Sequence, residues 1–553
     1  MINDLWYKNT VIYSLSVETF MDSDGDGVGD FKGLTRRLDY LHGLGVGAIW
    51  LSPFQPSPGR DDGYDVAEYY GIDPRLGTLG DFVEFAHGAR QRGIRVIMDM
   101  VINHTSDQHP WFKEARRDPQ SPYRDWYVWS EEKPENADEG MVFPGVQETT
   151  WTHDEAASAY YFHRFYHFQP DLNMGNPHVR AEILRIMGFW IQLGVSGFRL
   201  DAVPFAIADS GGKLEEDQPG FAYLRRIRAF VQWRLGESVL LAEANVPPSA
   251  AIDYFGHDAE RLQMMFNFPL NQAIFHALAT HTAAPIGEAL EATRQDQDAV
   301  QWGLHLRNHD ELDLGRLEEE QRQKVFDAFA PDPSMQLYDR GIRRRLAPMF
   351  DGDKRRLELA YSLLFTLPGT PVIRYGDEIG MGDDLTLPER DSVRTPMQWS
   401  DEPQGGFTKS EKPVEPVISD DRYGYRKVNV AHQRRDPESL LNWVERCIRM
   451  RKEIPEIGWG RDQVVDVGHP SVFALRYDWR GNSVLFIHNL CEDPCPIRFR
   501  VDGSDGRPAD LIDVLDHGHS SPDEDGCHAV TMEPYGYRWY RIGGLDYLLV
   551  RED

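Results

Sequence analysis

Three carboxylates stand at or just after the ends of apolar segments, where a charged side chain is costly to bury without a task. Asp201 ends the run GFRLD, Glu243 ends LLAE, and Asp310 follows LRNH. Two carboxyl groups in different environments can break a glycosidic bond, because one attacks the anomeric carbon while the other protonates the leaving oxygen. A third carboxylate can stabilise the positive charge that develops on the sugar. Capping of the following helix explains any one of these acids, but it explains the three together poorly.

Eight short apolar runs, separated by helical stretches, supply the elements that position these acids. Apolar strands that alternate with helices indicate a parallel sheet covered on both faces, and eight such units predict an α/β fold, the closed (β/α)8 TIM barrel. The active site of such a barrel lies at the carboxyl ends of the strands. The runs are VIYSLSV (11–17), GAIWLSP (47–53), RVIMDMV (95–101), GFRLDAV (197–203), VLLAEAN (239–245), MMFNFP (264–269), WGLHLRN (302–308) and PVIRYGD (371–377).

The pattern predicts three regions along the chain. The barrel occupies 1–102 and 174–464, and an insert at 103–173, rich in aromatic residues, histidine and proline, is expected to shape the substrate pocket. Runs such as SVFALRYDW and SVLFIHNL then alternate as antiparallel strands do, so 465–553 is predicted to form a C-terminal β-sandwich domain. Its edge strands leave two alternatives open: pairing with a second subunit in a homo-oligomer, or cover within the monomer.

The composition narrows the classes of partner. The chain has 553 residues with 59 Lys+Arg and 89 Asp+Glu, a formal net charge of −30. Such a surface repels nucleic acid and anionic membranes, so we expect a small neutral ligand. The N-terminal MINDLWYKNT lacks the apolar core of a signal peptide, and no apolar run is long enough to span a membrane, which makes a cytoplasmic location the expectation. Four cysteines form no dense disulfide framework.

Five short motifs carry a family resemblance. They resemble the signature segments of the α-amylase family of glycoside hydrolases and transglycosylases. The resemblance implies a retaining enzyme that acts on small α-glucosides, in which Asp201 is the nucleophile, Glu243 is the general acid and then the base, and Asp310 holds the sugar hydroxyls. The motifs are DMVINH (99–104), QPDLN (169–173), GFRLDAV (197–203), LLAEAN (240–245) and LRNHDE (306–311).

The same resemblance implies which side chains bind the sugar. Tyr64 would stack on the apolar face of the glucose, and Asp61 would grip its 4-hydroxyl and close the pocket behind a single terminal unit. Arg199 would keep the nucleophile ionised through its fixed charge. Arg394, the second arginine of RDSVRTPMQW, would reach the same sugar, with a surface salt bridge as the alternative. The other substrate-binding residues implied by the motifs are His104, Phe168, Gln169, His309 and Glu311.

The loop DSDGDGVGD (22–30) carries acidic residues at alternate positions, as calcium loops do, although Gly33 stands where an EF-hand has glutamate. A matching loop in the resembled family binds calcium or magnesium, so we expect a structural metal here and no organic cofactor. A merely solvated turn is the alternative. The expected ligands are Asp22, Asp24, Asp26, Val28 and Asp30. A second family site would use Asn103 and Asp171, but its last side-chain ligand is replaced by Ala208.

Several stretches resemble one group within this family, the trehalose synthases, which interconvert maltose and trehalose. They include SPFQPSPGRDDGYD, NHTSDQHPWF, GIRRRLAPMF and GTPVIRYGDEIGMGD. The resemblance implies that released glucose stays in a water-tight pocket, turns over, and attacks the glucosyl-enzyme through its 1-hydroxyl.

Three departures from that group keep other activities open. Phe205 replaces a tyrosine, Gly315 replaces a second glutamate, and the stretch 206–220 reads differently. Because these positions help to close the acceptor side, an α-glucosidase or a transglucosidase with another acceptor is the alternative. A catalytically silent sugar-binding relative is a third hypothesis, and the three intact carboxylates argue against it.

Overall fold

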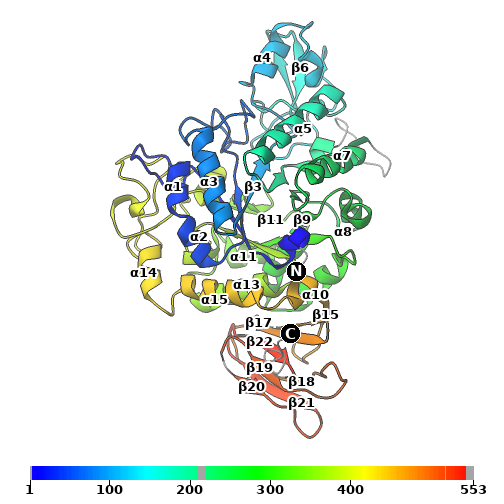
Figure 1. The fold of residues 1–553 in the computed structure, drawn as a ribbon, viewed down its shortest axis with the longest axis vertical. Helices are drawn as coiled ribbons and strands as arrows, with labels where there is room; N and C mark the ends of the chain where they lie inside the picture. The colour runs from blue at the N-terminus through cyan, green and yellow to red at the C-terminus, as the bar shows by residue number, and fades with distance from the viewer. Residues whose placement is uncertain (1–2, 208–218, 517, 544–553) are drawn as a thin grey trace.

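The computed structural model describes residues 3–207, 219–516 and 518–543, and a closed barrel of eight parallel strands lies at its centre (Figure 1). Apart from Arg95, every residue of these strands is buried, which explains their near-continuous apolar sequences. Each predicted run overlaps one strand, so the TIM barrel is confirmed. In order around the barrel the strands are β1 (Ile12–Leu15), β14 (Thr370–Arg374), β10 (Gln301–His305), β9 (Met264–Phe266), β8 (Val239–Ala242), β7 (Gly197–Leu200), β3 (Arg95–Met100) and β2 (Ala48–Leu51).

The register of neighbouring strands brings polar side chains together at the carboxyl edge of the barrel. Asp99 on β3 pairs with Arg199 on β7. Asp201 and Glu243 directly follow β7 and β8, and the amide of Glu243 donates to the carbonyl of Leu200 at 3.0 Å. The two carboxylates therefore leave adjacent strands at the same level.

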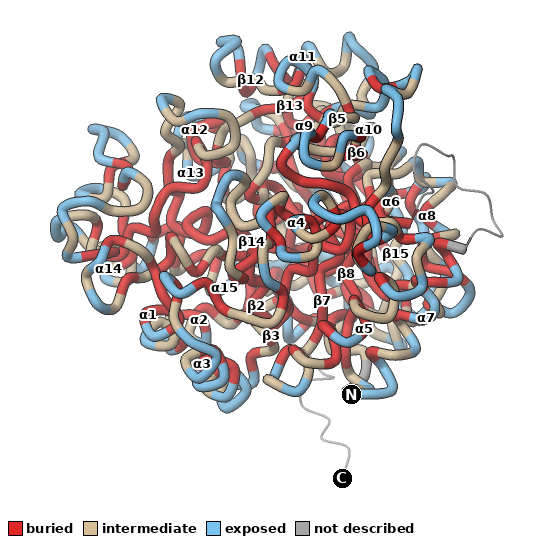
Figure 2. The backbone as a smooth tube through the Cα atoms, turned by 90° about the horizontal axis from the view of Figure 1, so that it is seen from above, coloured by how far each residue is buried: buried red, intermediate tan, exposed pale blue. Residues whose placement is uncertain are grey.

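Helices follow the strands and cover the barrel, with buried residues concentrated inside and exposed residues outside (Figure 2). The predicted apolar face after β1 is present, because Leu34, Leu38, Leu41 and Leu44 are fully buried, although Arg37 separates two helices there. Within the described residues, no helix combines the length and apolar character needed to cross a membrane. The helices are α1 (Phe31–Arg36), α2 (Leu38–Leu44), α3 (Leu79–Gln91), α5 (Pro177–Gln192), α6 (Val203–Ile207), α7 (Pro219–Arg234), α8 (Pro248–Phe255), α9 (Phe268–Thr280), α10 (Ala284–Ala292), α11 (Glu319–Phe329), α12 (Leu346–Met349), α13 (Lys354–Thr366), α14 (Val430–Arg435), α15 (Leu440–Lys452) and α16 (Glu456–Trp459).

The segment between β3 and α5 forms a separate layer, at the top of Figure 1. Its antiparallel sheet has the order β4-β6-β5 and packs on α4 through stacked rings, with Phe112 and Trp129 5.6 Å apart. A bridge between His104 and Asp171 joins the two ends of the insert. Its elements are α4 (Pro110–Arg117), η2 (Arg124–Trp126), β4 (Trp129–Ser130), β5 (Trp151–Asp154) and β6 (Ala159–Phe162).

Two antiparallel sheets form the C-terminal domain, at the bottom of Figure 1. They enclose an apolar cluster that includes Leu485, Ile487, Ile497 and Phe499. The larger sheet begins at Arg461, ahead of the expected boundary at 465, because β15 pairs with β16. In sheet order its strands are β15 (Arg461–Val464), β16 (Val472–Trp479), β17 (Asn482–Asn489), β22 (Tyr537–Ile542), β19 (Leu511–Asp513) and β20 (His519–Ser520), and the smaller sheet holds β18 (Cys495–Arg500) and β21 (Cys527–Met532).

The opposite face of the larger sheet packs on the barrel. Phe486 and Trp539 belong to the same apolar cluster as the barrel helices. Trp539 also donates from Nε1 to the hydroxyl of Ser362 on α13 at 2.8 Å. The sheet is therefore buried on both faces, by the barrel on one side and by the smaller sheet on the other.

Candidate active site

A cavity of about 380 Å³ lies at the carboxyl ends of the barrel strands. Asp201, Glu243 and Asp310 all line it, so three acids from separate strand ends share one site. Aromatic rings of the insert, Phe143 and Phe165, form part of its wall, as expected of a pocket-shaping insert. Five of the predicted substrate-binding residues line the same cavity: Asp61, Tyr64, His104, His309 and Glu311.

Arg199 lies beneath this cavity and contacts three carboxylates. Its Nη1 donates to Asp99 at 3.0 Å and to Asp201 at 2.5 Å, and its Nη2 donates to Glu243 at 2.5 Å. The guanidinium is almost completely buried. Because Asp201 and Glu243 bind adjacent nitrogens of one group, they are held as neighbours, as the short carboxyl separation of retaining glycosidases requires.

Asp201 and Glu243 differ in their readiness to ionise. Burial raises the pKa of Asp201 to about 6 and that of Glu243 to about 8, while the charge of Arg199 opposes both shifts. At neutral pH Asp201 is mainly ionised and Glu243 mainly protonated. This is the division that a nucleophile and a general acid need.

Asp310 has the opposite electrostatic environment. Burial opposes its ionisation, but the guanidinium groups of Arg390, Arg394 and Arg199 outweigh burial and lower its pKa. Arg390 Nη1 donates to Asp310 Oδ1 at 2.9 Å, and Arg394 Nη2 donates to the same oxygen at 3.2 Å. Asp310 is therefore a fixed negative charge, suited to accept hydrogen bonds from sugar hydroxyls.

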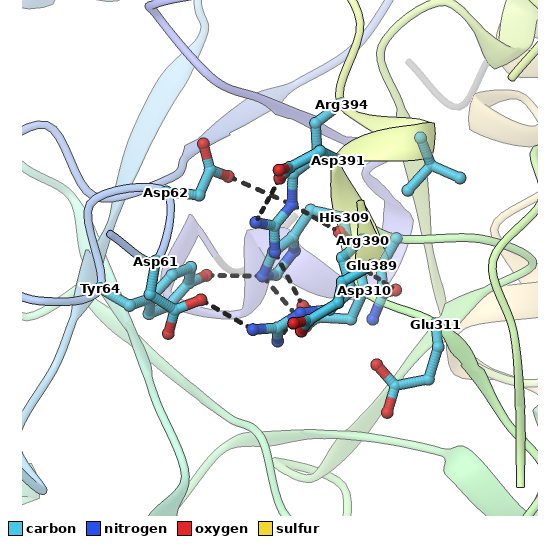
Figure 3. Close-up of polar contacts among 12 residues, drawn as sticks. Asp61, Asp62, Tyr64, His309, Asp310, Glu311, Glu389, Arg390, Asp391 and Arg394 are labelled. Atoms are coloured by element: carbon cyan, nitrogen blue, oxygen red, sulfur yellow. Dashed lines mark hydrogen bonds and ion pairs between the residues drawn. The ribbon is translucent and has the colours of Figure 1, made fainter. Parts of the chain in front are cut away.

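Asp61 lines the cavity, and two hydrogen bonds hold its carboxylate in place. Arg390 Nη2 donates to its Oδ1 at 2.7 Å, and Gln169 Nε2 donates to its Oδ2 at 2.8 Å. Arg390 thus bridges Asp61 and Asp310, whereas Arg394 pairs with Asp62 at 3.4 Å (Figure 3). Negative and positive side chains therefore alternate along one series of ion pairs, which runs Asp61, Arg390, Asp310, Arg394, Asp62.

Two histidines and a tyrosine complete the floor of the cavity. Tyr64 donates its phenol to Asp99 at 2.9 Å, and its ring stacks on His309 with 5.4 Å between centroids. Burial lowers the pKa of His104 to about 4 and that of His309 well below its usual range. Neutral imidazoles donate through one nitrogen and accept through the other, which suits the binding of neutral hydroxyls.

Besides Arg199, three predicted substrate-binding residues lie outside this cavity lining. Phe168 lines a neighbouring cavity, stacks on Tyr166 and lies under the guanidinium of Arg60. Gln169 is fully buried and holds Asp61 in place, and Arg394 approaches Asp310 from behind. Their contacts are thus with residues of the cavity walls, and their direct contact with substrate stays a prediction.

Sequence reasoning missed the role of Arg390. It weighed only the second arginine of RDSVRTPMQW, because the resemblance attached to that position, yet the first arginine joins the two carboxylates of the cavity wall. The signal available in the sequence was the pair Arg390 and Arg394, which are separated by three residues. Asp99, the first residue of the motif DMVINH, was given no role of its own, although it accepts a hydrogen bond from Arg199.

The acidic loop after β1 brings three predicted metal ligands together. One carboxylate oxygen from each of Asp22, Asp24 and Asp30 lies within 4.8 Å of the other two. Asp26 does not belong to this group of three; its Oδ1 accepts from the amide of Val28 at 2.8 Å. Three hard oxygen donors fit calcium or magnesium.

The doubtful second site is different. Asn103 and Asp171 line one small cavity, but the amide of Arg164 already donates to Asp171 at 2.9 Å, and burial raises the pKa of Asp171 to about 7. A carboxyl that is only partly ionised at neutral pH is a weaker ligand for a hard cation than a full carboxylate. Ala208, the position at which the last ligand is replaced, falls outside the described residues.

Comparison with known families decides to which family the chain belongs. A model described as the alpha amylase catalytic domain matches residues 12–330 and 341–460, and a sucrose hydrolase-like C-terminal domain matches 481–541. The chain belongs to the α-amylase family. It is therefore an enzyme of a family of glycoside hydrolases and transglycosylases, and the predicted resemblance is confirmed.

Individual relatives within the α-amylase family cover nearly the whole chain. A protein of Pimelobacter sp. named trehalose synthase is 41% identical, covering 98% of this chain and 96% of the relative. A trehalose synthase/amylase TreS of Mycobacterium tuberculosis is 40% identical, covering 97% and 90%. Among solved structures, the α-glucosyl transfer enzyme XgtA matches with a TM-score of 0.79 at 28% identity, covering 98% of this chain and 99% of that one.

Proposed function

We propose that the chain is a retaining α-glucosyl-transferring enzyme that interconverts maltose and trehalose within one closed pocket. The observation that carries the proposal is the fixed position of Asp61 in the cavity wall, where Arg390 and Gln169 hold its carboxylate. A carboxylate held there would bind a hydroxyl of a single terminal glucose and block a longer chain. The similarity to proteins named trehalose synthase supports the substrate class.

The chemistry proposed for the site proceeds in two displacements. Asp201 attacks C1 of the glucosyl unit while Glu243 gives its proton to the glycosidic oxygen, which leaves as the hydroxyl of free glucose. The glucose turns over in the pocket, and its 1-hydroxyl attacks C1 as Glu243 takes back the proton and Asp201 departs. Asp310 accepts hydrogen bonds from the glucosyl hydroxyls throughout, because its pKa stays low.

Incubation of the purified protein with maltose tests the proposal directly. Chromatography over time should show trehalose as the main product, with free glucose as the minor one. Release of glucose alone would rule out the isomerase. Formation of other disaccharides would identify a transglucosidase, and absence of turnover would favour the silent sugar-binding relative.

A second candidate, an α-glucosidase or transglucosidase with a wider acceptor range, rests on Phe205. Phe205 lines the cavity, is 39% exposed and lies under the guanidinium of Arg164. A phenylalanine there offers the acceptor no hydroxyl to hydrogen-bond. If this residue limits retention of glucose, Phe205→Tyr should raise the trehalose-to-glucose ratio, and an unchanged ratio would remove the support for this candidate.

We also propose a structural calcium or magnesium ion at the loop after β1, held by Asp22, Asp24 and Asp30. The clustering of three carboxylates supports this role, because their mutual repulsion falls when a cation joins them. The ion would supply charge neutralisation and rigidity to the loop, and no catalytic step depends on it.

A further inference from the structure

A second cavity lies against the catalytic one. It measures about 520 Å³ and is lined largely by charged side chains, among them Arg60, Arg75 and Glu415. Asp61 and Arg390 line both cavities. A roomy cavity with many polar partners is expected to hold water. The ion pair between these two residues is therefore part of the wall between a wet space and the proposed water-excluding pocket.

The wall depends on the short turn η6 (Glu389–Val393), because Arg390 is its second residue. Glu389, the residue before it, has φ of +38°, a strained value for a side-chain-bearing residue. Such a conformation persists only where surrounding contacts hold it. The backbone of Arg390 therefore depends on the contacts that fix Glu389, in addition to the ion pairs of its own side chain with Asp61 and Asp310.

Two tyrosines from different parts of the chain fix Glu389. Tyr166 of the insert donates its phenol to Glu389 Oε2 at 2.7 Å, and Tyr338 donates to the same oxygen at 2.5 Å. Phe143 packs on both tyrosine rings at 4.8 and 4.9 Å and on the guanidinium of Arg390 at 5.0 Å. We call Glu389, Tyr166 and Tyr338 the phenol clamp.

We propose that Glu389 is a positioning residue whose phenol clamp keeps the Asp61–Arg390 wall closed, and so sets how much of the glucosyl-enzyme is lost to water. The inference rests on the proposed function, because it concerns the covalent stage of that reaction. Without the carboxylate, the strained turn can relax, Arg390 moves from between Asp61 and Asp310, and the wet cavity opens onto Asp201. Water then competes with glucose for the same intermediate.

The experiment measures the fate of the glucosyl-enzyme rather than overall activity. Each variant receives p-nitrophenyl α-glucoside together with isotopically labelled glucose. Release of p-nitrophenol counts all glucosyl transfer to the enzyme, and labelled disaccharide counts the part captured by glucose. The difference between the two is the part hydrolysed by water.

Glu389→Ala should lower the transfer-to-hydrolysis ratio by about tenfold, because it removes two charge-assisted hydrogen bonds. Glu389→Gln keeps an acceptor oxygen and should stay close to the wild-type ratio. The double variant Tyr166→Phe/Tyr338→Phe should reproduce the Glu389→Ala result. Glu182→Ala is the matched control, because Glu182 also accepts a phenol, from Tyr70 at 2.6 Å, but lies on α5 away from both cavities.

The result that overturns the inference is an unchanged ratio in both Glu389→Ala and the double tyrosine variant, with folding checked by thermal melting. A fall in p-nitrophenol release at constant ratio would also overturn it, since Glu389 would then support the fold or the chemistry without excluding water. Failure of the proposed function is separate. It would show as no trehalose formed from maltose by the wild-type protein. The transfer-to-hydrolysis ratio with labelled glucose would still report whether the Asp61–Arg390 wall excludes water.

Discussion

At the scale of single residues, the site has two carboxyl groups that share one cation but differ in pKa. Arg199 contacts both Asp201 and Glu243, yet burial and the charges of Asp201 and Asp310 keep the pKa of Glu243 at about 8, above the value of about 6 for Asp201. The carboxyl that ionises at the lower pH is suited to be the nucleophile, and the one that keeps its proton longer is suited to be the general acid.

The pH dependence of kcat/KM follows from these values. Activity should rise as pH passes about 6, where Asp201 loses its proton, and fall as pH passes about 8, where Glu243 loses the proton it must donate. Initial rates on p-nitrophenyl α-glucoside between pH 4 and pH 10 measure this bell-shaped pH profile of kcat/KM. A profile flat from pH 5 to pH 9 would contradict the assignment of the two roles.

Replacement of the nucleophile gives the second prediction at this scale. Asp201→Ala should lower kcat by about 10⁴-fold or more, because the covalent route is lost, without unfolding the barrel. Initial rates and a thermal melt check the two parts. Substantial residual turnover would refute Asp201 as nucleophile, and Asp253→Ala on α8 serves as a control for loss of a carboxylate outside the site.

At the scale of elements, the strands and the short turns position different residues of the site. The strands bring the acids together, since β3, β7 and β8 end beside one another. The turn η6 supplies Arg390, which ties Asp61 to Asp310. The eight strands were predictable because buried parallel strands have continuous apolar sequences. The contacts of Arg390 were not predictable, because no local sequence pattern indicates which distant carboxylate an arginine in a turn will contact.

The prediction at this scale concerns the metal site proposed at the loop after β1. After removal of metal with a chelator, added calcium should raise the unfolding midpoint by several degrees, since an ion at 100 times its Kd stabilises by about 2.7 kcal/mol. Asp24→Ala should abolish that rise, because it removes one of the three converging carboxylates.

Calorimetry or a thermal melt with and without calcium measures the effect. Asp466→Ala is the matched control, because Asp466 also accepts a backbone amide two residues ahead but lies far along the chain, in the C-terminal region. A calcium response that survives in Asp24→Ala would contradict the proposed ligand set.

At the scale of the whole molecule, the C-terminal domain is bound to the barrel by an apolar face. Trp539 is fully buried there, meets Phe486 edge to face at 5.4 Å, and hydrogen-bonds to Ser362. The barrel, the insert and this sheet thus share one extended core. Whether the edge strands also pair with a second subunit stays a prediction.

Trp539→Ala should therefore destabilise the folded state by about 3–5 kcal/mol and lower the unfolding midpoint, as expected for removal of a fully buried aromatic ring. Trp233→Ala is the control, because Trp233 on α7 is 89% exposed and should change stability little. Thermal and urea unfolding measure both variants. Equal midpoints for the two would contradict a shared core between the domain and the barrel.

The sequence by itself determined the barrel, the order of its strands along the chain and the three acids, because apolar periodicity and short motifs are local properties. Asp201, Glu243 and Asp310 were recognisable at their strand ends before any distance was known. Only the tertiary structure decided that Arg199 joins two of them, that Gln169 and Arg394 hold Asp61 and Asp310, and that Arg390 joins Asp61 to Asp310. Those contacts join segments up to 329 residues apart, as Asp61 and Arg390 are. Their geometry depends on how loops pack on a completed barrel, which no local pattern encodes.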